Sequence, residues 1–428
     1  MNSGIIFIQL LLILCVAHAL GRVAYWCGQP AVIGHLLAGV IAGPMVLGQY
    51  HPELRTYLFS NVVGLMALSK IGLVFIMFGL GLEVGKSEKA TGAVNGRGVV
   101  AIAVAGFLGA GLAGMLLGYF THGTFAAGTD RGPYMLFFGV AMAATAVPVL
   151  AAILDDRRFL HHRLAPLVLN AAVVTDILAW FALSVVLVSL SSGGLKGIFF
   201  SSVTLVVLVI VAEFMISRRY SSAASAKPGA DSTKVLVAAL IVLFAFCVVT
   251  DLANAHVTIG AFIAGLAFRK HSVLREFWEK GPHALVSQFF TPLFFGTAAM
   301  NVAINAADWP ELLMWAGVFF LVGGAGKVGM SYLSARVTGL SKSDALVVAT
   351  LMNTKGVMEI ILLTVGLEIG VISAQLYAIL MVVALVATVI TLPVVRLIPL
   401  SKAAPSATNT VLRSAHKESK KRPLMDSV

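Results

Sequence analysis

Long, nearly unbroken runs of apolar residues recur along this chain and constrain its fold more than any other feature. A membrane-spanning helix needs about 20 such residues. The sequence is 59% hydrophobic and only 11% charged, whereas soluble domains carry about 25% charged residues. This composition excludes a soluble enzyme, a disordered chain and a secreted disulfide scaffold. Outer-membrane barrels are also excluded, because their segments alternate apolar and polar residues over about ten positions.

The apolar runs predict an all-α, polytopic membrane protein with about thirteen transmembrane helices. The ninth run is short, so a count of twelve stays open. A polar loop at 221–232 divides the chain roughly in half, and the basic tail at 401–428 is expected to be disordered. The expected spans are 3–21, 30–48, 62–83, 98–119, 133–153, 164–190, 197–216, 235–251, 256–268, 285–304, 312–333, 345–367 and 374–398.

The basic residues are distributed unevenly among the predicted loops. With the N-terminus placed outside, 24 of the 30 lysines and arginines fall on the cytoplasmic side, three fall outside and three fall within spans. Cytoplasmic loops are enriched in Lys and Arg, so this split places the C-terminus in the cytoplasm. It also explains the net charge of +11 as topology, and no nucleic-acid partner is expected. We expect a multi-pass protein of a bacterial inner (plasma) membrane.

A short pattern suggests that the two halves of the chain are related. Residues 33–39 read IGHLLAG, and residues 259–265 read IGAFIAG. These patterns lie in the second and the ninth predicted spans, which are seven spans apart. Spans separated by an odd number cross the membrane in opposite directions. Such an inverted repeat is typical of secondary transporters, whose substrate lies near the bilayer midplane. Small residues at this spacing are also common helix-packing devices, so the pattern alone does not decide.

Two ionisable residues lie in the middle of predicted spans. Asp176 is near the centre of the segment 164–190, and Lys327 is near the centre of 312–333. A charge at the bilayer centre costs at least about 2.5–3.5 kcal/mol, and such residues usually mark an ion or proton path. A carboxylate would keep Lys327 charged, and Asp176 is the natural partner. The alternative is a pair that only holds the helices together.

Two predicted spans carry interruptions at corresponding positions of the halves. One contains ATAVP at 144–148, with Thr145 and Pro148, and the other contains NTKGVME at 353–359. Irregular backbone is tolerated in a membrane only where it is buried or lines a cavity. Paired interruptions of this kind are the best sequence indication of a transporter site. Two alternatives stay open: Pro148 as a simple kink, and Glu359 as an i,i+4 partner of Lys355.

The remaining motifs add little. His35, within the second segment, is either a pH-sensing group or a packed polar residue. The sequence lacks a phosphate-binding loop, an H-E-x-x-H motif and any Cys/His cluster. We therefore expect no cofactor, no catalytic residues and no enzymatic activity.

Together these residues resemble a known family, the Kef-type branch of the monovalent cation:proton antiporters (cation:proton antiporter 2 group). The resemblance runs from about residue 5 to 398. Thr175-Asp176 falls at the family's ion-site dipeptide, Lys327 at its buried basic residue, and Asn353 begins its second crossover. Further matches lie in the second and third segments, at 30–44 and 70–83.

The resemblance implies a sodium/proton antiporter-like fold of inverted repeats, with two crossed, broken helices in each copy of a homodimer. The sodium/proton exchanger-type transmembrane domain would occupy 1–400. Its core domain, at about 98–190 and 312–398, would move like an elevator against a dimer domain at about 30–83 and 235–304.

The expected function is secondary active antiport of Na⁺ or K⁺ against protons by alternating access. Asp176 would be the shared cation and proton site, with Thr175 and Thr145 as further oxygen ligands, and Lys327 would pair with it in the ion-free state. Many family members carry two acids at the dipeptide, whereas Thr175 leaves one. Alternatives are an organic-anion or bile-acid-type symporter of similar fold and a non-transporting membrane sensor.

Overall fold

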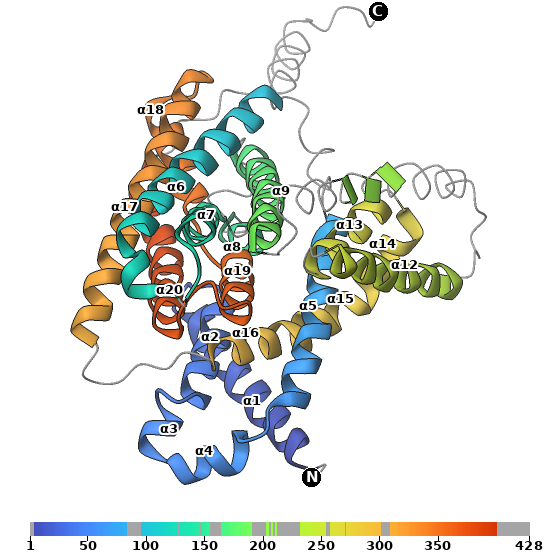
Figure 1. Cartoon of the computed structure of the whole chain (residues 1–428). Coiled ribbons are helices and arrows are strands. Elements are labelled where there is room, and N and C mark those ends of the chain that lie inside the picture. The colour runs from blue at the N-terminus through green and yellow to red at the C-terminus, as the bar shows by residue number, and fades with distance from the viewer. Residues whose placement is uncertain are drawn as a thin grey trace, which may run out of the picture.

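The computed structural model describes residues 4–83, 96–126, 128–145, 147–154, 164–190, 232–253, 257–269, 271–300 and 309–399, with short pieces at 203–204, 207–208 and 210–211. Within these residues every named element is a helix (Figure 1). The expected seventh span at 197–216, the loop at 221–232 and the tail at 401–428 lie almost entirely outside the described residues.

Helices of the first half begin and end close to the predicted spans. The longest apolar runs form single helices, and the run with Pro148 forms two. A short helix, α4, was not predicted, because its sequence is too polar and too short for a span. The helices are α1 (Gly4–Trp26), α2 (Ala31–Ala42), α3 (Leu47–Tyr50), α4 (Pro52–Phe59), α5 (Val63–Glu83), α6 (Gly96–Phe125), α7 (Arg131–Ala143), α8 (Val147–Leu154) and α9 (Leu164–Leu190).

The second half repeats this order. Its unpredicted helix, α14, follows α13 after a bend of 118° and buries Leu274 and Trp278 on one face, which leaves too few apolar residues for a span. The helices are α12 (Ser232–Leu252), α13 (Val257–Phe268), α14 (Ser272–Lys280), α15 (Pro282–Leu285), the π-helix η4 (Val286–Phe290), α16 (Thr291–Ala299), α17 (Trp309–Val337), α18 (Lys342–Met352), α19 (Val357–Glu368) and α20 (Ala374–Leu397).

The described helices fit a multi-pass membrane protein. Eight of them, with α2 and α3 counted together, are long and apolar enough to cross a bilayer, and the bent pair of α13 and α14 would make nine. The predicted spans at 133–153 and 345–367 are each divided into two shorter helices. The all-α class is thereby confirmed, although the described residues do not yield the full count of thirteen.

The repeated glycine pattern makes equivalent contacts in the two halves. In α2, Gly34 packs against α1, and a Cβ on Gly39 would lie 2.0 Å from a backbone oxygen of α16. In α13, Gly260 packs against α12, and a Cβ on Gly265 would lie 2.2 Å from a backbone oxygen of α5. Each second span therefore packs on the first span of its own half and on the third span of the other half. This reciprocal packing between the halves is consistent with an inverted repeat.

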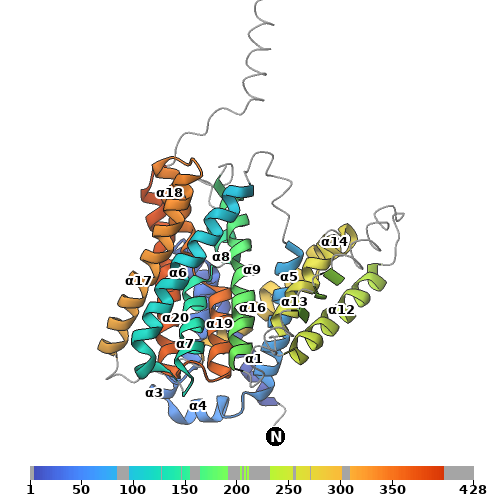
Figure 2. The ribbon, with the colours of Figure 1, turned by 45° about the horizontal axis from the view of Figure 1, so that its top comes forward.

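Helices α6 and α17 lie side by side along one edge of the helix bundle (Figures 1 and 2). A Cβ on Gly109 of α6 would lie 2.5 Å from Gly326 O, and a Cβ on Gly326 of α17 would lie 2.6 Å from Gly109 O. Only glycine permits so close an approach of two helix backbones. The contact brings the neighbouring Lys327 up to the interrupted helices.

Candidate functional site

The first interruption separates α7 from α8. Helix α7 ends at Ala143, and Ala144 is extended, with φ −57° and ψ 148°. Pro148 lies in the first turn of α8, where the missing N–H costs no helical hydrogen bond. Pro148 therefore stands at the start of a new helix, which settles the alternative of a simple kink in favour of a break.

The second interruption separates α18 from α19. Helix α18 ends at Met352, and Asn353 donates its backbone N–H to Thr350 O at 3.1 Å. The hydroxyl of Thr354 donates to Leu351 O at 2.7 Å. These bonds satisfy two of the carbonyls that a helix end leaves without partners.

The two interruptions lie against each other. The hydroxyl of Thr145, in the first break, donates to Met352 O, the last residue of α18, at 3.2 Å. Both residues are buried. The predicted meeting of the two broken helices is therefore present, and it places the carboxyl ends of α7 and α18 close together.

Lys327 reaches this place from α17. Its side chain is fully buried, and Nζ donates to Ala143 O, to Ala144 O at 2.7 Å and to Thr145 Oγ1 at 2.6 Å. The carbonyl end of a helix carries a partial negative charge. The ammonium of Lys327 therefore neutralises the carboxyl end of α7.

Lys355 supplies a second ammonium to the same helix end. It donates to Met142 O at 2.9 Å, to Ala141 O at 3.3 Å and to Glu359 Oε1 at 3.1 Å. The i,i+4 pair of Lys355 with Glu359 is therefore formed, and both side chains are almost completely buried. Through its bonds to Ala141 and Met142, Lys355 also links this pair to the end of α7. The i,i+4 spacing in the sequence does not predict that contact between helices.

Asp176 lies on α9, which packs against α7, α8 and α18. Its side chain is 5% exposed, and the buried Oδ1 atom has no hydrogen-bond partner among the described residues. Lys327 acts on it electrostatically, but among the described residues no ion pair joins the two, because Nζ is bonded to α7. The expected pair is thus replaced by helix-end contacts, and Asp176 keeps an unsatisfied acceptor, which a proton or cation could occupy.

The hydroxyls of Thr175 and Thr145 have different hydrogen-bond partners. Thr175 is fully buried and donates to Ala171 O of its own helix at 2.9 Å, which leaves its oxygen free to accept. Thr145 donates to Met352 and accepts from Lys327, so a cation could reach its oxygen only after Lys327 moved.

Two other positions complete the account. His35 lies at the contact of α2 with α1, 6.2 Å from the ring of His18, and is not part of the cluster around the breaks. Sequence reasoning missed Thr388 of α20, whose hydroxyl donates to Lys355 O at 2.5 Å. Its only sequence signal was a threonine in an otherwise apolar run.

Known proteins with similar sequences are cation/proton antiporters. The K(+)/H(+) antiporter 1 of Saccharomyces cerevisiae is 31% identical over 396 residues, which is 86% of this chain and 43% of that protein. The Cation/H(+) antiporter 19 of Arabidopsis thaliana is 30% identical and matches 96% of this chain and 52% of its own length. The Na(+)/H(+) antiporter NhaS4 of Synechocystis is 31% identical, with 91% and 96% covered. The chain thus spans about half of the yeast and plant relatives.

A solved structure shares the fold. The sodium proton antiporter MjNhaP1 from Methanocaldococcus jannaschii superimposes with a TM-score of 0.59 over 92% of this chain and 96% of that chain, at 18% identity. The family described as sodium/hydrogen exchanger, transmembrane, matches residues 7–397. With crossed broken helices and a buried acid beside them, this chain belongs to the sodium/hydrogen exchanger transmembrane family.

Proposed function

We propose that this protein is a secondary active antiporter, not an enzyme, that exchanges a monovalent cation, Na⁺ or K⁺, for protons by alternating access. The observation that carries the proposal is the buried Oδ1 atom of Asp176, which has no hydrogen-bond partner among the described residues and lies beside two broken helices. A buried acceptor without a donor is costly, and a proton or a cation removes that cost. The names of the relatives, which pair Na⁺, K⁺ or other cations with H⁺, support this substrate class.

The two substrates compete for one group. In the deprotonated state the carboxylate of Asp176 would bind the cation, with the free lone pairs of Thr175 as a second oxygen ligand. Thr145 would join only when Lys327 leaves its hydroxyl. A proton and a monovalent cation each bring one positive charge to the same carboxylate, so each excludes the other. Lys355 and Glu359 would hold the end of α7 in place during the exchange.

The proposed architecture is that of the Kef-type branch, with a homodimer in a bacterial inner membrane. The packing of the helices supports a division into two moving parts. Helices α6, α7, α8, α9, α17, α18, α19 and α20 pack together and would form the core, and α1, α2, α5, α12, α13 and α16 pack together and would form the dimer domain. The distribution of lysines and arginines supports an outside N-terminus and a cytoplasmic C-terminus.

Reconstituted protein in liposomes tests the function. An imposed Na⁺ or K⁺ gradient should drive proton movement that a pH-sensitive dye reports, with the membrane potential clamped. Asp176→Asn should reduce the rate to that of empty liposomes, because the amide neither releases a proton nor binds a cation strongly.

Glu53→Gln, a change of an exposed acid on α4, is the matched control and should exchange normally. Exchange that survives Asp176→Asn would refute the assignment of the site. Flux that needs no counter-ion would refute antiport and indicate a channel, and uptake of an organic anion would indicate a symporter.

A further inference from the structure

Lys355 is bonded in the second break through its backbone as well as through its side chain. The ammonium donates to the end of α7 and to Glu359. The backbone oxygen of Lys355 accepts the hydroxyl hydrogen of Thr388, on α20, at 2.5 Å. Lys355 therefore joins α7, α19 and α20, and the contact with α20 has no part in the ion site around Asp176.

The carbonyl of Lys355 needs a donor that the helices do not supply. Lys355 lies between the end of α18 at Met352 and the start of α19 at Val357. No backbone N–H among the described residues donates to its oxygen. Both Lys355 and Thr388 are buried, and a buried carbonyl without a donor is costly. The hydroxyl of Thr388 thus satisfies an acceptor that the break leaves open.

This contact distinguishes Thr388 from its neighbour Thr391. The hydroxyl hydrogen of Thr388 is shared between Lys355 O and Ala384 O, which lies one turn earlier on α20, at 2.8 Å. Within the described part of the chain, the hydroxyl of Thr391 donates only to Ala387 O of its own helix, at 2.7 Å. The two threonines are equally buried, at 3% exposed, so they differ in their acceptors and not in their burial.

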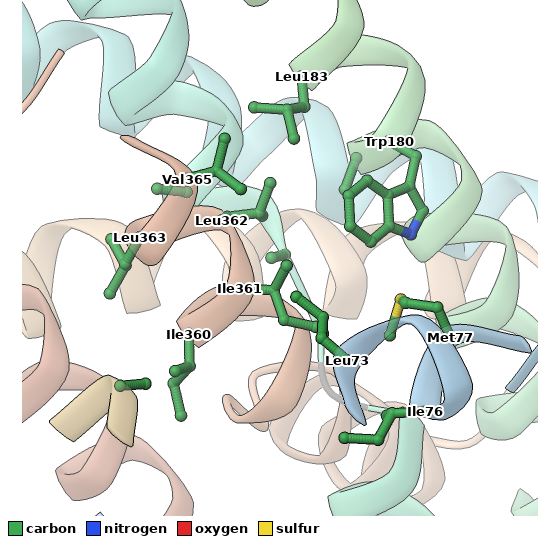
Figure 3. Packing of buried hydrophobic residues seen from close by; sticks show 14 of the residues in the cluster. Leu73, Ile76, Met77, Trp180, Leu183, Ile360, Ile361, Leu362, Leu363 and Val365 are labelled. Atoms are coloured by element: carbon green, nitrogen blue, oxygen red, sulfur yellow. The ribbon is translucent and has the colours of Figure 1, made fainter. Parts of the chain in front are cut away.

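The helix that follows the break is fixed by apolar packing. Residues 360–363 of α19 are fully buried in a hydrophobic cluster that includes Trp180 and Leu183 of α9 (Figure 3). The segment 353–356 reads NTKG and has no apolar side chain to pack. Its backbone therefore depends on hydrogen bonds, and loss of the Thr388 contact should move the break while α19 stays in place.

Gly356 makes the peptide group after Lys355 easy to rotate, because glycine has no Cβ and meets few steric barriers. Without the hydroxyl of Thr388, the carbonyl of Lys355 is free to turn toward another donor. That rotation moves the base of the Lys355 side chain. The ammonium then leaves Met142 O and Ala141 O, which lie 2.9 Å and 3.3 Å from Nζ.

We propose that Thr388 is a positioning residue for the exchange reaction. Its hydroxyl fixes the backbone of the second break so that Lys355 reaches the carboxyl end of α7. Among the described residues no hydrogen bond joins Thr388 to Asp176 or Thr175, so Thr388 acts through Lys355. The proposal rests on the antiport function, which the unmodified protein tests separately.

Substitutions of the two threonines test the proposal in the liposome assay. Thr388→Val keeps the shape of the side chain but removes the hydroxyl, and should lower kcat by about three- to tenfold, the range expected for one lost hydrogen bond. The apparent KM for the cation should change by less than about twofold, because no proposed cation ligand is altered.

The matched control is Thr391→Val, which removes a hydroxyl of equal burial from the same helix and should exchange normally. Thr388→Ser keeps the hydroxyl and should restore kcat. A normal kcat in Thr388→Val would refute the proposal, and so would an equal loss in Thr391→Val.

A double substitution tests whether Thr388 acts through Lys355. In protein that carries Lys355→Met, Thr388→Val should change kcat by less than about twofold, because the group that it positions is gone. Equal factors in the two backgrounds would mean that Thr388 only supports the fold, which contradicts the proposal.

Unfolding midpoints of the same four proteins decide the matter if Lys355→Met does not exchange. Thr388→Val should then destabilise the Lys355→Met protein less than it destabilises the unmodified protein, and equal shifts would refute the proposal. If the unmodified protein itself does not exchange, antiport is refuted, and the midpoints still show whether Thr388 positions Lys355.

Discussion

The ammonium of Lys327 lies 2.6 Å from the hydroxyl oxygen of Thr145, in the gap between the halves of the first broken helix. Lys327 therefore acts as a cap for the carboxyl end of α7. Because Lys327 has these partners, the carboxylate of Asp176 has no ion pair within the part of the chain that the structure describes. The stability of the broken helices and the availability of Asp176 thus depend on one side chain.

Lys327→Met should destabilise the protein, because it leaves the buried oxygens of Ala143, Ala144 and Thr145 without a donor. Each such group costs about 1–3 kcal/mol. We expect a lower midpoint of thermal unfolding for the detergent-solubilised protein. Lys280→Met, at an exposed position, is the control. An unfolding midpoint equal to that of the unmodified protein would show that these contacts do not hold the break together.

The buried pair of Lys355 and Glu359 should show strong coupling. Glu359→Leu alone leaves a buried ammonium without its carboxylate, which costs about 3–5 kcal/mol. The double change Lys355→Met with Glu359→Leu should be less destabilised than Glu359→Leu. The unfolding midpoints of the two singles and the double form a cycle that measures this coupling. Strict additivity of the two changes would contradict the prediction.

The contact of α6 with α17 should not tolerate a side chain. Gly109→Ala places a Cβ 2.5 Å from Gly326 O, and forced helix separation costs about 1–3 kcal/mol. Gly317→Ala on α17 meets nothing within 4 Å and should be neutral or slightly stabilising. Thermal unfolding of the two variants in the same detergent separates them. Equal midpoints would mean that the two helices can part without cost.

Thr175 should affect cation affinity more than it affects folding. Among the residues that the structure describes, its hydroxyl bonds only to Ala171 O within its own helix. Thr175→Val keeps the shape of the side chain but removes the oxygen, so the apparent KM for the cation should rise several-fold while the unfolding midpoint changes little. Thr175→Ser keeps the oxygen and should behave as the unmodified protein. Unchanged KM in Thr175→Val would remove this residue from the proposed ligands.

Much of the fold could be predicted because a bilayer makes apolar length informative. The predicted span at 164–190 has the bounds of α9, and the interruptions at 144–148 and 353–359 are both breaks between helices. The helices α4 and α14 escaped prediction because they are short and partly polar. Their positions depend on packing, such as that of Trp278 against Phe78.

The candidate site was predictable in its residues but not in its contacts. Asp176 and Lys327 were found because charges are rare in mid-span. Their direct pairing was expected from charge alone, yet the backbone oxygens of α7 compete for the same ammonium. Carbonyl acceptors have no sequence signature, because every residue carries one. The reach of Lys355, in the break before α19, to the end of α7 was missed for the same reason.

The two broken helices are alike in backbone but not in charge. Among the described residues, the carboxyl end of α7 receives two ammonium groups, and that of α18 receives the hydroxyls of Thr145 and Thr354. Interchanging the roles of the halves therefore does not return the molecule to an equivalent state. In the proposed antiport cycle, the two orientations of such a molecule would therefore differ in free energy.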